Sequence, residues 1–175
     1  MRPRCSLVLA MLWCAAPAWA DGKETRVRGL DPTAVRILAA AAEGSPTVRA
    51  MLDRLEASDL IVYVKFVPRV DRPRAVTGIL AAVPEARYVL ISITTFAGEA
   101  DHFLLLGHEL QHAVELADAP DVRDNPSMSR LYERIGWRES PLVYETPEAQ
   151  EAGRVVQREM WARRSRPDEL VASSR

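Results

Sequence analysis

Cysteine is almost absent from this sequence: Cys5 and Cys14 are the only two among 175 residues, and both lie within the first twenty. Those twenty residues have the pattern of a secretory signal peptide, with a basic start, an apolar run at 5–16 and Ala18-Trp19-Ala20 before Asp21. A membrane anchor needs about twenty apolar residues, so this run is too short to be one. We expect cleavage after Ala20 and a protein that is secreted or periplasmic.

Without its first twenty residues the chain has no thiol, which excludes disulfides, a cysteine nucleophile and a cysteine metal ligand. The chain also lacks a basic excess. Once Arg2 and Arg4 are removed, 21 basic residues face 24 acidic ones, a net charge of −3. This balance gives no reason to expect a nucleic-acid partner, and we expect no stable membrane insertion after signal cleavage. The sequence does not indicate an oligomeric state.

Glycine is scarce, and four X-Pro pairs predict where helices begin: Asp31-Pro32, Ser45-Pro46, Asn125-Pro126 and Thr146-Pro147. A short polar residue followed by proline is typical of a helix N-cap and first turn. The predicted helices therefore cover 33–43, 46–57, 125–135 and 147–164. The segments at the two ends of the mature chain are polar, so we expect a flexible lead at 21–30 and a disordered tail at 165–175.

Three segments rich in β-branched and aromatic residues predict strands at 60–67, 75–82 and 87–95. The connections between them are short, which favours antiparallel pairing over parallel crossovers. The expected fold is α+β, with a small three-stranded, mostly antiparallel sheet packed against helices in a single domain at 31–164. A helix at about 98–117 follows the last strand directly.

That last helix carries the sequence H-E-L-Q-H at residues 108–112. In a helix, His108 and His112 lie one turn apart on the same face, so both imidazoles can reach one metal ion. Glu109 lies about 100° around the helix, from where it can reach a water on that metal. His102, six residues earlier, points to another side, and we expect it to be exposed.

The H-E-x-x-H motif resembles that of the zincins, a family of zinc-dependent metallopeptidases. The order of a strand meander followed by the motif helix also resembles the upper half of the zincin fold. The resemblance implies Zn²⁺ bound by His108 and His112, Glu109 as general base, and a peptide or protein substrate. It further implies that one strand at a sheet edge binds the extended substrate by main-chain pairing.

A catalytic zinc ion requires a third protein ligand. No histidine follows His112, which excludes the metzincin pattern, and the gluzincin-like solution uses a glutamate from a later helix. Glu145 is the favoured candidate, because Glu148 is explained as a first-turn acid that faces the helix dipole. Glu115 lies about 10 Å along the helix from His108, which makes it a poor ligand for the same ion.

A hydrogen-bond donor for the developing oxyanion is also expected, and Tyr144 is the candidate nearest to the predicted ligand. Tyr132 is physically equivalent at this level, and Arg134, Arg138 and Arg154 stay open. The alternative function is a secreted, non-catalytic metal-binding or interaction domain on the same scaffold. The fourth metal position separates the two, because a catalytic site leaves it open to water and a structural site fills it with a side chain.

Overall fold

The structure is a computed structural model of the chain and describes residues 25–67, 75–94, 99–140 and 143–165. The predicted signal peptide lies outside these ranges, as does nearly all of the predicted C-terminal tail. The described residues form an α+β fold of five helices, a four-stranded sheet and a two-stranded sheet, which confirms the predicted fold class.

The first two helices begin at the predicted X-Pro pairs. In α1 (Pro32–Gly44) the Asp31 side chain accepts a hydrogen bond from the amide of Ala34 at 3.0 Å. In α2 (Pro46–Glu56) Ser45 does the same for Val48. These side chains satisfy amides that the first turn of a helix leaves without a partner, so the chain turns sharply between two packed helices.

The main sheet corrects the predicted topology. Its strands are β1 (Val27–Gly29), β2 (Leu60–Val67), β3 (Ala75–Val83) and β4 (Ala86–Thr94), in the order β1-β2-β4-β3. The pairs β1–β2 and β2–β4 are parallel, and only β3–β4 is antiparallel. The expectation of a three-stranded, mostly antiparallel sheet was therefore wrong.

The error has a physical reason. Short connections do join consecutive strands, but β2 and β3 are not neighbours: the β3–β4 hairpin places β4 beside β2 and leaves β3 at the edge. The expected flexible lead at 21–30 was also wrong in part, because Val27–Gly29 forms β1 and pairs with β2. A three-residue strand is too short to give a periodic sequence signal.

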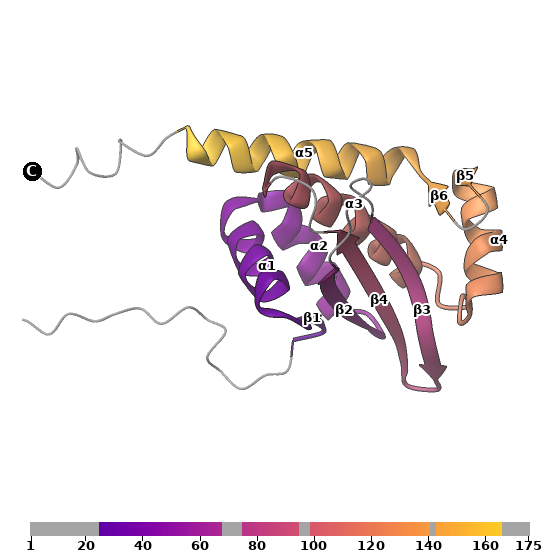
Figure 1. Cartoon of the computed structure of the whole chain (residues 1–175). Helices are drawn as coiled ribbons and strands as arrows, with labels where there is room; N and C mark the ends of the chain where they lie inside the picture. Colours follow the sequence, from indigo (N-terminus) through magenta and orange to yellow (C-terminus); the bar gives the residue numbers. More distant parts are fainter. Residues whose placement is uncertain (1–24, 68–74, 95–98, 141–142, 166–175) are drawn as a thin grey trace, which may run out of the picture.

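Helices cover one face of the main sheet (Figure 1). The motif helix α3 (Glu99–Ala117) lies between the sheet and the long helix α5 (Pro147–Arg164), which runs over it. Beyond α3 come α4 (Asn125–Ile135) and the hairpin of β5 (Trp137–Ser140) and β6 (Val143–Glu145). The helix boundaries agree with the predicted ones, whereas β5 and β6 were not predicted.

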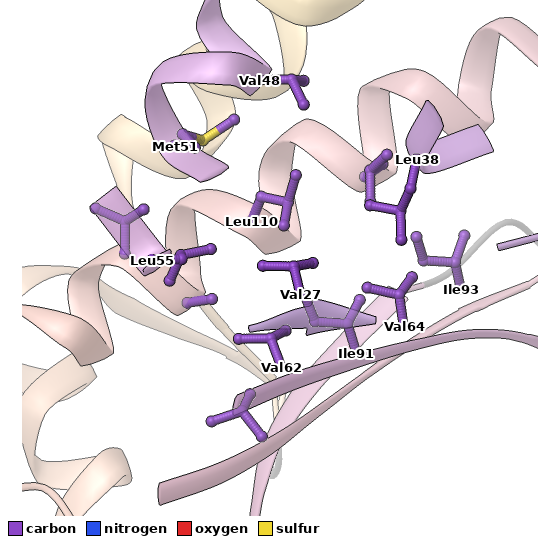
Figure 2. Close-up of a cluster of buried hydrophobic side chains, with 14 of the residues drawn as sticks. Val27, Leu38, Val48, Met51, Leu55, Val62, Val64, Ile91, Ile93 and Leu110 are labelled. Carbon is purple, nitrogen blue, oxygen red and sulfur yellow. The ribbon is translucent and has the colours of Figure 1, made fainter. Parts of the chain in front are cut away.

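The core lies between the sheet and this helical layer. Alternate residues of β2 are buried, and they meet side chains from α1, α2 and α3 (Figure 2). Leu110 of the motif points into this cluster together with Val62, Val64 and Ile91. The core thus fixes the rotation of α3, and with it the direction of the motif's polar side chains. None of the described helices has the length and apolar character needed to cross a membrane.

Candidate functional site

The two motif histidines face each other on α3. Their Nε2 atoms lie 3.1 Å apart, and the ring planes are inclined at 79°. The side chain of His112 is buried, and that of His108 is 13% exposed. The predicted helix geometry therefore brings the two imidazoles together.

Glu145, at the end of β6, lies beside them. Its Oε2 atom is 3.4 Å from Nε2 of His108. Donors bound tetrahedrally to one zinc ion at 2.0–2.2 Å are about 3.3–3.6 Å apart. The His108–Glu145 and His108–His112 separations thus agree with a shared ion to within about 0.3 Å.

The arrangement is not a completed metal site. Within residues 25–67, 75–94, 99–140 and 143–165, no group of three or more His, Cys, Asp or Glu side chains is arranged to hold a metal ion. The two Nε2 atoms instead lie at hydrogen-bond distance from each other. Binding would therefore require rotation of an imidazole or of the Glu145 carboxylate.

Glu115 supports His112 from the other side of the ring. Its Oε2 accepts a hydrogen bond from Nδ1 of His112 at 2.8 Å, and its Oε1 accepts one from Thr146 at 2.6 Å. A neutral imidazole that donates from Nδ1 keeps its lone pair at Nε2, the atom a metal would bind. Carboxylates in this position orient metal-binding histidines. Glu115 is therefore placed to support a ligand rather than to act as one.

Glu109 is buried and points toward the sheet. Its Oε2 accepts a hydrogen bond from the Thr77 hydroxyl of β3 at 2.5 Å. Burial raises the pKa of this carboxyl, although the neighbouring His112 and the Thr77 hydrogen bond oppose the shift. The side chain is thus held on the strand side of the histidine pair, and it takes up a proton more readily than an exposed glutamate.

The pKa values of the other three groups also reflect their crowding. Burial, followed by the charge of His112, lowers the pKa of His108 to about 4. Burial alone would lower the pKa of His112, but its hydrogen bond to Glu115 and the charges of the surrounding carboxylates raise it above the ordinary value. Burial raises the pKa of Glu145 against the attraction of His112. A neutral imidazole, as favoured at His108, is the form that binds metals.

The structure distinguishes the two candidate tyrosines. The Tyr132 hydroxyl donates to the backbone carbonyl of His112 at 3.0 Å, deep in the core, so its proton is already used. Tyr144 stacks on Tyr132, and its oxygen accepts a hydrogen bond from Arg138 at 2.9 Å. The hydroxyl hydrogen of Tyr144 is not used in that bond. Tyr144 therefore keeps a hydrogen that its bond with Arg138 does not use, whereas Tyr132 donates its own to His112.

A pocket of about 40 Å³ lies beside Glu109, His112, Tyr144 and Glu145, whereas His108 is not among the residues that line it. It has room for an ion and a few water molecules, since one water needs roughly 10–15 Å³ by this measure. Its walls come from the start of β3, from α3, from α4 and from β6. The lining residues are Ala75, Val76, Thr77, Glu109, His112, Met128, Tyr132, Val143, Tyr144 and Glu145.

The remaining candidates lie elsewhere. Glu148 is exposed in the first turn of α5, and Arg134 is exposed near the end of α4. Arg154 forms an exposed pair with Glu151. The expected exposure of His102 was wrong: the residue is buried, and its ring meets Phe66 edge-on at a centroid distance of 5.0 Å.

Two residues at the site were missed by sequence reasoning. Thr77 gives no local signal, because its contact with Glu109 depends on where β3 packs against α3. Thr146 was recognised as the helix cap, and it does accept from the amide of Ala149, but its hydroxyl also donates to Glu115. A capping residue and a site residue cannot be told apart by sequence pattern when one side chain serves both roles.

Comparisons with protein families, with curated proteins and with solved structures give no match to this chain.

Proposed function

We propose that the protein is a secreted, zinc-dependent hydrolase of the metallopeptidase type, with a peptide amide as its substrate. The observation that carries this proposal is that His108 of α3 lies within 3.1 Å of His112 and 3.4 Å of Glu145 from β6, and that His112 and Glu145 line one pocket with Glu109. A chance match to H-E-x-x-H on a helix gives no reason for a carboxylate from a distant hairpin to lie there.

The donor set suits zinc, since two imidazoles and one carboxylate leave a fourth position for water. In this proposal His108, His112 and Glu145 hold the ion, and Glu115 orients His112. When bound, zinc supplies a water of lowered pKa and polarises a carbonyl. The choice of Glu145 over Glu148 is supported by its 3.4 Å distance from His108.

Glu109 acts as the general base in this proposal. Its carboxylate accepts the proton of the attacking water and returns it to the leaving amine. The hydrogen bond from Thr77 holds one carboxylate oxygen, which leaves the other for proton transfer. The raised pKa of the buried Glu109 carboxyl suits a group that must hold a proton between two steps.

Tyr144 is the proposed donor to the oxyanion that forms on the substrate carbonyl. Arg138 donates to the phenol oxygen and lies over the ring at 5.3 Å from its centroid, which fixes the side chain and favours donation from its hydroxyl. Donors of this kind stabilise developing charge because they are already oriented.

The substrate strand is proposed to lie along β3. This strand is at the edge of the sheet and supplies Ala75, Val76 and Thr77 to the pocket wall. An extended peptide that pairs with β3 would pass close to Glu109 and the histidines. Main-chain pairing gives affinity without demanding one particular sequence.

The test is the metal content of the protein from Asp21 onward, purified without chelator, beside the variants His112→Ala and Glu109→Gln. We expect about one zinc per chain in the wild type and in Glu109→Gln, and loss of zinc in His112→Ala. Hydrolysis of a peptide mixture should be lost in both variants. Full activity in Glu109→Gln, or no zinc uptake by the wild type, would contradict the proposal.

The small pocket favours a second candidate, a secreted domain that binds metal without catalysis. The same experiment separates the two functions. Zinc that is bound through His112 together with no hydrolysis of any peptide by the wild type would support the non-catalytic domain.

A further inference from the structure

The Asn125 side chain occupies part of the β3 edge. Its Nδ2 donates to the carbonyl of Ile79 at 3.1 Å, and its Oδ1 accepts from the amide of Ile79 at 3.0 Å. These are the two bonds that a residue of a neighbouring antiparallel strand would exchange with Ile79. One side-chain amide thus takes the place of a peptide unit at this point.

The register shows which other groups face the same way. Ala75, Thr77 and Ile79 lie in continuous antiparallel register with Ile93, Ile91 and Val89 of β4. In such a pair, alternate residues direct their main-chain amide and carbonyl away from the neighbour. Since Ile79 directs both groups to Asn125, Thr77 and Ala75 direct theirs to the same open side.

Asn125 is held firmly in this position. It is the first residue of α4, directly after the N-cap Asp124, whose side chain accepts from Ser127 in a capping box. Arg123, on the other side of the cap, donates to the carbonyl of Val83 near the far end of β3. The start of α4 therefore covers β3 from Ile79 onward, and no other segment among the described residues bonds to the main chain of Ala75 or Thr77 on that side.

We propose that Asn125 is a fixed stop for the substrate, so that peptides are cleaved close to one of their ends. This inference rests on the proposed peptidase function. A peptide paired with Thr77 lies beside Glu109, and Ile79 is two residues, about 7 Å, farther along the strand. On that side, about two substrate residues fit before the chain meets the Asn125 amide.

Cleavage mapping tests the proposal. The zinc-loaded wild type is given unstructured peptides of increasing length, with free or blocked ends, and the products are identified by mass spectrometry. We expect cleavage within about two residues of one end, whatever the length. In Asn125→Ala, cleavage of bonds farther from that end should rise at least tenfold. Arg130→Ala, at an exposed position of the same helix, leaves the Ile79 bonds intact; it is the matched control and should keep the wild-type pattern.

A second measurement does not depend on turnover. Amide hydrogen exchange is followed by NMR in Glu109→Gln with and without a ten-residue peptide. We expect the peptide to slow amide exchange at Ala75 and Thr77 but not at Ile79, and to slow it at all three residues once Asn125→Ala is added. If the wild type cleaves internal peptide bonds, or if Asn125→Ala has the same cleavage pattern as the wild type, the proposal that Asn125 limits the substrate is wrong. Absence of all hydrolysis would instead overturn the proposed function on which it rests.

Discussion

At the scale of single residues, the site consists of side chains that each serve two partners. His112 meets His108 with one ring nitrogen and Glu115 with the other. Glu115 in turn accepts from Thr146, the cap of α5. Substitutions of Glu115 or Thr146 should therefore change the proposed metal binding, although neither residue is proposed as a ligand.

Replacing Glu115 by glutamine tests this. The variant keeps the shape of the side chain but loses the charge that orients His112, and we expect zinc affinity to fall by about 10–100-fold. A competition titration against a chromophoric chelator measures the change. Glu148→Gln is the control, because Glu148 is exposed in the first turn of α5. If the two variants bind zinc with equal affinity, Glu115 does not orient His112 for metal binding.

The tyrosines give a second contrast. Tyr144→Phe should lower kcat by about 100-fold with zinc still bound, because it removes the proposed oxyanion donor. Tyr132→Phe loses the buried bond to the His112 carbonyl and should cost about 1 kcal/mol of stability. Steady-state kinetics and urea unfolding of both variants separate the roles. A Tyr144→Phe enzyme with unchanged kcat would exclude Tyr144 from catalysis.

At the scale of elements, α3 and α5 approach closely at two glycines. A Cβ at Gly107 would lie 2.7 Å from Cγ2 of Val156, and one at Gly153 would lie 2.8 Å from the carbonyl oxygen of Leu104. The second neighbour is backbone, so it cannot move aside without moving α3. The packing of α5 on the motif helix thus depends on the absence of side chains at these positions.

Gly153→Ala tests that packing. Alanine gains about 1 kcal/mol in helix propensity over glycine, but overpacking costs about 1–3 kcal/mol. Because the added Cβ would also lie 3.3 Å from Cβ of His108, we expect a net loss of stability together with weaker zinc binding. Arg154→Ala, at the exposed neighbouring position, should have little effect on urea unfolding. A stabilised Gly153→Ala would show that α5 can shift freely.

Sequence reasoning predicted the helices well, because their boundaries depend on local caps such as Asp31 and Ser45. It placed His108 and His112 together for the same reason, since one helical turn separates them. The predicted strand order was wrong, because the order depends on pairing between strands that are not consecutive in the sequence. The contact between Thr77 and Glu109 was not predicted either, since it joins β3 to α3 through tertiary packing.

At the scale of the whole molecule, one buried cation ties the sheet to the helical layer. Arg87 of β4 is fully buried and donates to the carbonyls of Leu116, Ala119 and Val122, at and beyond the end of α3. It also forms a two-bond pair with Asp59. The position of the C-terminal end of α3 therefore depends on a charge that needs its carboxylate partner.

Asp59→Asn should reveal this dependence through pH. The pair with Arg87 holds the pKa of the Asp59 carboxyl below its usual value, despite opposition from partial burial. Its contribution is fully present above the ordinary Asp pKa and is lost as pH falls below that value. We expect the variant to be less stable by about 2–3 kcal/mol at neutral pH. Urea unfolding at several pH values measures the difference in free energy of unfolding between the wild type and the variant. This difference should shrink below about pH 4. A difference that stays constant with pH would contradict the role of the Asp59 charge.

The sheet order also shapes the path by which the chain acquires its fold. Strand β2 is an apolar segment whose neighbour β4 is made later, after all of β3, so a growing chain presents β2 before its partner exists. Exposed strands of this kind pair readily with other chains. A fragment that ends before Ala86 should therefore aggregate, whereas the complete β3–β4 hairpin supplies β4 as the partner of β2 and removes that exposed edge.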